Sequence, residues 1–307
     1  LNPLRKIHIK STIKGELMDG FLLVDKAGGM TSHDVVAMAR KKLNTKRVGH
    51  AGTLDPMATG VLVLGVGVAT KLLPYITDGK KAYEATISLG KATHTDDKEG
   101  EVISTADTSA ITDEQIKLEL AKFVGKIKQK PSSVSAIKID GKAAHQRVRE
   151  GEVVDLPARD VEIFKLEVNQ IRHLADSIEV DVIVDCSAGT YIRAIARDLG
   201  NELKVGGHLT ALHRTLVSPF DISECAPIAD AQLIDTAQSI GKIFPIRKLD
   251  LAEIREISFG RAISQSPDQG ISAAIDNQDR FYALLENKQQ GGAVVAAPIL
   301  VNASVKE

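Results

Sequence analysis

The feature that most constrains the fold is a strict alternation of apolar and polar residues in two separate segments. In KAYEATISLG (81–90) the alternating apolar residues are Tyr83, Ala85, Ile87 and Leu89. In IEVDVIVDC (178–186) they are Val180, Val182, Val184 and Cys186. Because successive side chains of a strand point to opposite faces, each segment predicts a strand with one buried face. A sheet of such strands needs other elements to cover that face.

Helical signals occur between the strand signals in an irregular order. Residues 31–43 and 112–124 each begin with a Ser/Thr capping pattern and continue with an apolar stripe. The expected stripe of the second segment consists of Ile116, Leu120, Phe123 and Val124. TYIRAIARDLGNEL (190–203) also has a helical stripe, and Gly200 is expected to break its regularity. Because strands outnumber helices without a repeating βα unit, the sequence predicts an α+β fold with a mixed β-sheet.

The length of 307 residues is sufficient for a large and a small domain. Short strand-like segments such as FYALLE and GGAVVAAPILV follow residue 248, which predicts domains at 1–248 and 249–307, the second small and β-rich. No apolar run reaches the roughly 18 residues that a membrane-spanning helix needs. Cys186 and Cys225 form no CxxC pair, and the expected location is the cytoplasm.

Basic residues are concentrated in two segments, although the formal net charge of the chain is −1. Residues 40–50 contain five lysines and arginines and no acid. Residues 122–149 contain eight, against Asp140 alone. An uneven distribution of this kind suits a protein that binds a polyanion with one part of its surface. The alternative interpretation is that both segments are solvated surface without a ligand.

Several common catalytic and ligand-binding patterns are absent from the sequence. GVGVATK (65–71) is neither a Walker loop nor a GxGxxG turn. The eight histidines never occur at metal-ligand spacing, and no GxSxG segment marks a serine nucleophile. The segment HTDD (94–97) is interpreted as a solvated acidic turn rather than as a metal site. The sequence therefore predicts chemistry without a metal or a cofactor.

A single acid lies within the turn-forming stretch GHAGTLDPMATG (49–60). Pro56 biases Asp55 toward an extended or turn conformation, and three glycines allow the chain to bend and another molecule to approach the backbone. The pattern predicts a carboxylate presented from a rigid turn. The alternative is an Asx-type turn, in which Asp55 only accepts hydrogen bonds from backbone amides.

GHAGTLDPMATG resembles the catalytic motif of the TruB family of pseudouridine synthases, which isomerise a uridine in the T loop of tRNA. Other stretches resemble family motifs in the expected order, so that the resemblance covers about residues 20–220: GFLLVDKAGGMTSHDVV, KAYEATISLG, CSAGTYIRAIARDLG and ALHRTLVSPF. One residue departs from the family pattern. The family commonly has proline after the lysine of the first motif, whereas this chain has Ala27, which lacks the φ restraint of proline.

The resemblance implies an enzyme that converts uridine 55 to pseudouridine after the base is extruded from the folded loop. It implies three catalytic residues, namely Asp55, Tyr83 and Arg193, with Arg193 keeping Asp55 ionised. The residues alone leave alternatives open: Tyr83 or Leu212 as a core residue, His50 in a simple turn hydrogen bond, and Arg193 in a surface ion pair with Asp198 or in a phosphate contact. The resemblance also implies the substrate-binding residues His50, Tyr191, Leu212, Lys26, Arg47 and Lys138. Among these, His50 would fill the gap that the extruded base leaves.

The resemblance further implies that a basic insertion at about residues 122–155 grips the RNA stem-loop and that the C-terminal domain is a PUA-like RNA-binding domain. It implies tRNA as the partner of a monomeric enzyme, with no cofactor and no protein partner. A catalytically idle RNA-folding protein, a nucleotide-binding protein and a guide-RNA-dependent relative are the alternatives. The presence of all three catalytic residues argues against the first, and the missing phosphate-binding loop argues against the second.

Overall fold

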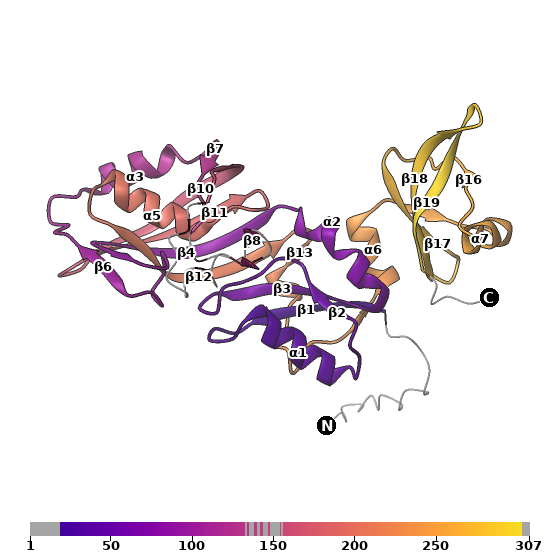
Figure 1. Cartoon of the computed structure of the whole chain (residues 1–307), viewed down its shortest axis with the longest axis horizontal. Helices are drawn as coiled ribbons and strands as arrows, with labels where there is room; N and C mark the ends of the chain where they lie inside the picture. Colours follow the sequence, from indigo (N-terminus) through magenta and orange to yellow (C-terminus); the bar gives the residue numbers. More distant parts are fainter. Residues whose placement is uncertain are drawn as a thin grey trace, which may run out of the picture. The chain divides into compact units, whose positions relative to one another are not determined.

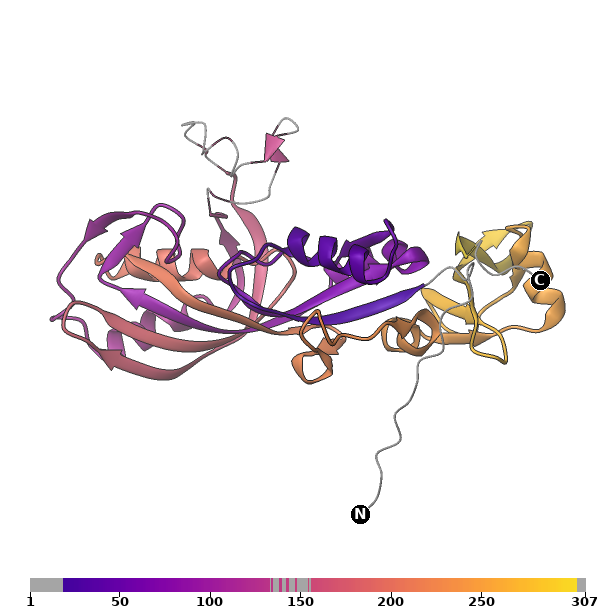
Figure 2. The ribbon, with the colours of Figure 1, turned by 90° about the horizontal axis from the view of Figure 1, so that it is seen from below.

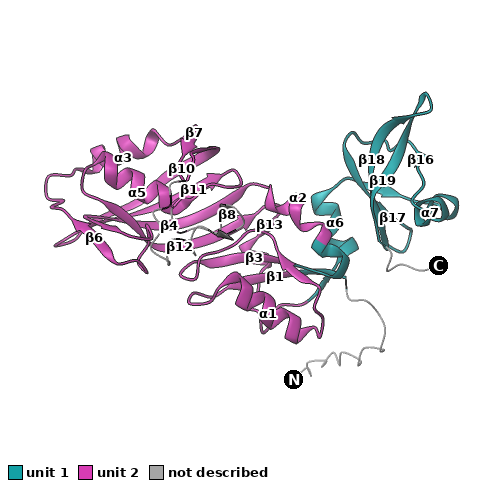
Figure 3. Cartoon of the chain, in the orientation of Figure 1, with its two compact units in different colours: residues 1–21, 65–70, 233–307 teal, residues 22–64, 71–232 magenta. Residues whose placement is uncertain are grey.

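The computed structural model describes residues 19–132, 134, 138–139, 142–143, 147, 154 and 156–302. The chain divides into two compact units (Figure 3). Unit 1 comprises residues 1–21, 65–70 and 233–307, and unit 2 comprises residues 22–64 and 71–232. All the site residues expected from the sequence belong to unit 2. The domain boundary at residue 248 stays a prediction.

A large mixed sheet forms the centre of unit 2 (Figure 1). Its principal strands are, in spatial order, β1 (Gly20–Lys26), β3 (Thr59–Val66), β12 (Gly207–Val217), β4 (Lys81–Leu89), β11 (Ile178–Cys186), β10 (Arg159–His173) and β7 (Gly125–Gln129). Two short strands extend it, β2 (Val48–His50) beside β3 and β13 (Phe220–Asp221) beside β12. β12 pairs with β3 in parallel and with β4 antiparallel. The predicted α+β fold with a mixed sheet is therefore confirmed.

The two alternating segments are adjacent strands, β4 and β11, as the alternation requires. Tyr83 lies opposite Val184 of β11 and opposite Arg214 of β12. Ala85 lies opposite Val182 in the same way. The alternating residues of both strands are buried, so that rows of apolar side chains from neighbouring strands form one continuous face of the sheet.

Helices cover parts of this sheet. Figure 1 shows α1 (Ser32–Lys42), α2 (Leu73–Thr77), α3 (Asp113–Ala121) and α5 (Ile192–Glu202). Thr31 caps α1, where a Ser/Thr cap was predicted, and Thr112 caps α3 through the predicted capping box. Thr31 also forms a capping box, with Asp34 at its third position. The stripe expected for residues 116–124 is wrong in its second half, because α3 ends at Ala121 and leaves Val124 exposed.

Helix α5 packs against β12 and β4, and Gly200 makes this possible. The predicted helix is confirmed, since α5 continues through Gly200 to Glu202. A Cβ atom at position 200 would lie 2.1 Å from the backbone nitrogen of Gly207. The missing side chain therefore lets the helix approach β12 closely, which fixes where the N-terminal turn of α5 lies above the sheet.

Two small pairs of strands complete unit 2. They are β5 (Lys91–Thr93) with β6 (Val102–Thr105), and β8 (Lys138–Ile139) with β9 (Lys142–Ala143). Of the basic insertion expected at residues 122–155, the structure describes 122–132, 134, 138–139, 142–143, 147 and 154 (Figure 2), and the remaining residues lie outside the described part of the chain. The segment from β5 to β6 is described completely and contributes to the site.

Unit 1 contains a five-stranded sheet, as expected for a β-rich C-terminal region. Its strands are, in spatial order, β15 (Ile246–Lys248), β17 (Ile271–Ile275), β18 (Phe281–Gln290), β19 (Ala293–Val301) and β16 (Ile263–Ser264). Helix α7 (Leu251–Ser258) contributes Ile254 and Ile257 to its core. The unit also includes α6 (Thr236–Ile243) and β14 (Ile234–Asp235), which pairs with Gly20 and Phe21. Among the described residues, no helix is long and apolar enough to span a membrane.

Candidate active site

Asp55 lies in the connection between β2 and β3, and contacts from two other segments hold this turn. The Ser32 hydroxyl, at the start of α1, accepts a hydrogen bond from the Leu54 amide at 2.9 Å. The Lys26 ammonium donates to the carbonyls of Met30 at 2.8 Å and Pro56 at 3.3 Å. These hydrogen bonds connect the first glycine turn to the turn of Asp55. Lys26 is only 1% exposed, so the connection lies inside the protein.

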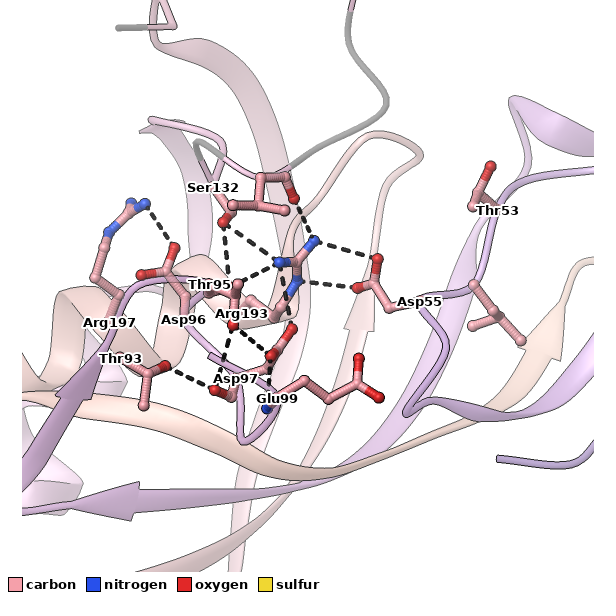
Figure 4. A network of polar contacts seen from close by, with 12 residues as sticks. Thr53, Asp55, Thr93, Thr95, Asp96, Asp97, Glu99, Ser132, Arg193 and Arg197 are labelled. Atoms are coloured by element: carbon pink, nitrogen blue, oxygen red, sulfur yellow. Dashed lines mark hydrogen bonds and ion pairs between the residues drawn. The ribbon is translucent and has the colours of Figure 1, made fainter. Parts of the chain in front are cut away.

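Asp55 forms a bidentate pair with Arg193, from the first turn of α5 (Figure 4). The Arg193 Nε atom lies 2.9 Å from Oδ2 of Asp55, and an Nη atom donates to Oδ1 at 3.2 Å. Arg193 is 4% exposed, whereas the Asp55 side chain is 34% exposed. The alternative pairing of Arg193 with Asp198 is wrong, since Asp198 binds Arg197. The arginine is therefore fixed inside the protein, and the carboxylate that it holds is partly buried.

The remaining donors of Arg193 bind the segment between β5 and β6 and the segment that follows β7. One Nη atom donates to the Thr95 carbonyl at 2.7 Å and lies 3.4 Å from the Asp97 carboxylate. The other donates to the Val134 carbonyl at 2.9 Å. One helical turn further, Arg197 lies 3.4 Å from the Asp96 carboxylate. The contacts of Arg193 hold its guanidinium in the plane that the bidentate pair with Asp55 requires.

The interpretation of HTDD (94–97) as a solvated acidic turn is wrong. Asp96 and Asp97 are buried, because each faces an arginine of α5. The sequence does contain a signal for this arrangement. Arg193 and Arg197 are four residues apart, which places both on one face of a helix, and two adjacent acids can meet such a pair.

The pKa of the Asp55 carboxyl lies above its ordinary value. Burial is the largest cause, and the nearby Asp97 carboxylate acts in the same direction. Arg193 and Lys26 act in the opposite direction by favouring the charged form. Arg193 therefore supports ionisation of Asp55, as expected, but it does not fully offset the cost of burial.

Replacing Asp97 with asparagine should lower the pKa of Asp55, because it removes a nearby negative charge. The amide retains an oxygen for the Thr95 hydroxyl and the Glu99 amide, which both bind Oδ1. The measurement is a ¹³C NMR titration of the Asp55 carboxyl group. Asp198→Asn is the matched control, since Asp198 pairs with Arg197 rather than with Arg193. This variant should leave the pKa of Asp55 unchanged. An unchanged or raised pKa in Asp97→Asn would contradict the prediction.

A cavity of about 490 Å³ opens beside Asp55. It is lined by five of the residues that the sequence singled out, namely Asp55, Tyr83, Tyr191, Arg193 and Leu212. These come from the β2–β3 turn, β4, the start of α5 and β12, which are distant in sequence. Burial raises the pKa of the Tyr83 hydroxyl above its ordinary value, so this group stays protonated at neutral pH. The cavity thus combines the rings of Tyr83 and Tyr191 with the Asp55 carboxylate, and Asp78 also lies in its wall. Such a lining suits a flat polar base.

Three other expected site residues, His50, Lys26 and Arg47, are not among the described residues that line this cavity. His50 lies on β2, with its ring edge-on to His33 at 5.4 Å between centroids. Burial, aided by His33, lowers the pKa of His50, so its ring is neutral at pH 7. Lys26 is buried beneath the turn, and Arg47 is exposed just before β2. Lys138 belongs to β8, but its side chain lies outside the described part of the chain.

The sequence comparisons agree on one family. Residues 40–192 match the model of the N-terminal domain of TruB family pseudouridylate synthases. The chain is 48% identical over 281 residues to a tRNA pseudouridine synthase B of Corynebacterium efficiens, covering 90% of this chain and 95% of that protein. It is 47% identical to a protein of the same name from Mycobacterium leprae, covering 96% of each. A relative of that name from Rhodococcus jostii is 50% identical, with 88% of this chain and 90% of that protein covered.

A solved structure supports the fold independently. It is described as the structure of an H/ACA RNP bound to a substrate RNA containing 2′-deoxyuridine. It matches with a TM-score of 0.69 at 21% identity and covers 95% of this chain and 87% of that chain. With relatives near 48% identity over almost the whole length and a fold shared at this level, the chain belongs to the TruB family of pseudouridylate synthases.

Proposed function

We propose that this enzyme isomerises uridine 55 in the T loop of tRNA to pseudouridine, with Asp55 as its catalytic carboxylate. The observation that carries the proposal is the bidentate Asp55–Arg193 pair at the wall of a cavity that also contains Tyr83. The relatives named tRNA pseudouridine synthase B match along 90–96% of their length, which supports tRNA as the substrate.

The reaction explains why one acid is sufficient. Isomerisation breaks the bond between N1 of the base and C1′ of the ribose, turns the base, and forms a bond between C5 and C1′. No water or second substrate enters, so the pair of acids that a hydrolase uses is not required. Asp55 acts as a nucleophile or as a stabiliser of the ribosyl centre, and Arg193 holds its carboxylate in a fixed orientation.

We assign Tyr83, Tyr191 and Leu212 to the binding of the extruded base. All three line the cavity, and the ring of Tyr83 offers a flat surface on which a uracil can stack. For Lys26 we propose a positioning role in place of a substrate contact. Its ammonium is buried and donates hydrogen bonds to the carbonyls of Ala27, Met30 and Pro56. These bonds use its three hydrogens to support the turn that carries Asp55.

We propose phosphate contacts for the exposed Arg47 and for the basic insertion that includes Lys138. Such contacts would give an affinity that decreases with salt. The proposal also includes an RNA-binding role for the C-terminal region and action as a monomer in the cytoplasm. Size-exclusion chromatography of the enzyme with and without tRNA tests the proposed monomeric state. A dimer under either condition would contradict it.

The test of the proposed function uses an unmodified T stem-loop RNA. The purified enzyme is incubated with it, and pseudouridine is mapped by carbodiimide labelling and primer extension. We expect one modified position, uridine 55. The matched control RNA carries cytidine at that position and should remain unmodified. Absence of pseudouridine in the first RNA, or its formation elsewhere in the second, would overturn the assignment.

Replacing His50 with alanine should slow turnover on the folded stem-loop by roughly tenfold or more, because extrusion costs a few kcal/mol and the gap stays empty. The neutral ring of His50 is suited to stacking between bases. A buried nitrogen of that ring, Nδ1, has no hydrogen-bond partner among the described residues. The measurement is single-turnover kinetics on the folded stem-loop and on a short linear RNA.

The defect of His50→Ala should be smaller on the linear RNA, where the uridine is already unstacked. His173→Ala is the matched control, because this exposed histidine pairs with Asp113 outside the cavity. It should leave both rates unchanged. An equal defect on both RNAs, with an unchanged melting temperature, would contradict the role of His50 in base extrusion.

A further inference from the structure

Two buried cations lie at the cavity wall, and the proposed reaction uses neither of them. Lys81 begins β4 and is 7% exposed, and Arg214 lies on β12 and is 1% exposed. Both line the cavity together with Gly52. A Cβ atom at position 52 would lie 3.6 Å from an Nη atom of Arg214 and 3.7 Å from Cε of Lys81. A side-chain carbon here would be in ordinary van der Waals contact with both cations, which places the turn of Gly52 directly against them.

The hydrogen bonds of both cations go to neutral carbonyl groups. Arg214 donates through Nε to the Val61 carbonyl at 2.8 Å, and through its Nη atoms to the carbonyls of Gly52 at 3.2 Å and Thr53 at 3.4 Å. Within the described residues, no carboxylate forms an ion pair with Arg214 or with Lys81. Buried charges without a counter-charge are costly, so this arrangement favours an anion that a ligand supplies.

Lys81 keeps one donor for such a ligand. Its ammonium donates to the Thr77 carbonyl at 2.6 Å and to the Gly79 carbonyl at 3.0 Å, which uses two of its three hydrogens. Burial and the nearby Arg214 lower the pKa of Lys81 to about 8, while Cys186 and Asp78, a carboxylate in the same cavity wall, act in the opposite direction. Burial raises the pKa of the Cys186 thiol to about 11, so this neighbour is neutral.

We propose that Lys81 and Arg214 form an anion subsite for a backbone phosphodiester beside the extruded uridine. The inference rests on the proposed function, because it takes RNA as the ligand of this cavity. A nucleotide whose ribose faces Asp55 carries its 3′ phosphate on O3′ of the ring and its 5′ phosphate through C5′ and O5′, so both phosphates stay close to the ribose. Asp55 and Gly52 belong to the same turn, and Lys81 lines the same cavity beside Gly52, so a phosphate of the same nucleotide reaches Lys81. Lys81 contacts the phosphate, and Arg214 contributes its charge while supporting the turn.

The experiment removes the charge of one phosphate at a time. T stem-loop RNAs carry a neutral methylphosphonate on the 5′ or on the 3′ side of uridine 55, and their affinity is measured by fluorescence anisotropy. Asp55→Asn is used throughout so that the RNA is not consumed. At one of the two positions, we expect the methylphosphonate to weaken binding roughly tenfold or more, as a charged hydrogen bond is lost. With Lys81→Met added, the same methylphosphonate should have almost no further effect.

Lys80→Met is the matched control, because Lys80 is an exposed neighbour whose ammonium lies 4.4 Å from the centroid of the Phe164 ring. It should retain the full effect of the methylphosphonate, and so should Lys81→Arg. The effect should also shrink as the pH rises above about 8, because Lys81 then loses its proton. This dependence tests the subsite even if Lys81→Met does not fold.

Equal methylphosphonate effects with and without Lys81 would overturn the proposal, as would no effect at either position or no change with pH. A further arm uses inorganic phosphate as a competitor of the RNA. Inorganic phosphate should compete with the RNA more weakly in Lys81→Met than in the protein that retains Lys81. Equal competition in both proteins would show that the phosphate binds elsewhere. A failure of the proposed function is seen separately, since it appears as a missing pseudouridine in the wild-type enzyme rather than in these affinities.

Discussion

Asp55→Asn should abolish pseudouridine formation, lowering the single-turnover rate on the T stem-loop by on the order of 10⁴-fold or more, as loss of an essential carboxylate does. Asparagine has the shape of aspartate but cannot ionise or attack carbon. Its amide group would also face the donors of Arg193. The loss should therefore appear in the chemical step, while the affinity for the RNA changes little.

The fold of Asp55→Asn should be preserved. The pKa of Asp55 is raised by burial, so ionisation of this group at neutral pH costs stability rather than adding to it. A neutral side chain avoids that cost, and the melting temperature should not decrease. The matched control is Asp198→Asn, whose parent residue pairs with Arg197 on the same helix, and it should keep most of the activity. If Asp55→Asn turns over within tenfold of wild type, Asp55 is not the catalytic carboxylate.

Local patterns in the sequence were sufficient for the elements that carry the site. The alternation around Tyr83 predicts β4 because a strand exposes its side chains with a period of two, and the Ser/Thr capping patterns predict the starts of α1 and α3. The fold class followed from the same patterns. The pairing of Asp55 with Arg193 did not, since these residues are 138 positions apart. Only the resemblance to a family implied it.

Features that depend on distant partners were missed. The acids at 96 and 97 have the composition of a surface turn, and only the packing of α5 above them turns them into buried partners of two arginines. Gly200 looks like a helix breaker, but the backbone of Gly207 makes glycine necessary there. For Lys26, a lysine next to a glycine turn gives no local sign that its ammonium is buried. Each of these depends on a contact that no short window of sequence contains.

Arg193→Lys should lower the rate of pseudouridine formation by roughly 10²–10³-fold, as expected when a positioned charge-stabilising group is displaced. Lysine keeps the positive charge but has a single nitrogen. It cannot bind both oxygens of Asp55 while also donating to the carbonyls of Thr95 and Val134. The carboxylate should therefore lose its fixed orientation, and the main effect should fall on kcat rather than on KM.

Arg193→Met separates charge from geometry at the same position. Arg193 lowers the pKa of Asp55, so its removal should raise that pKa further, and the acid limb of the kcat/KM profile should move to higher pH. In Arg193→Lys the acid limb of the kcat/KM profile should move less, because lysine keeps the positive charge. The rate on the plateau of that profile is nevertheless already low. Arg197→Lys, one turn along α5 and paired with Asp96 and Asp198, is the matched control and should leave the acid limb unchanged. A normal rate in Arg193→Lys would show that charge alone is required, and an unmoved limb in Arg193→Met would show that Asp55 ionises independently of this arginine.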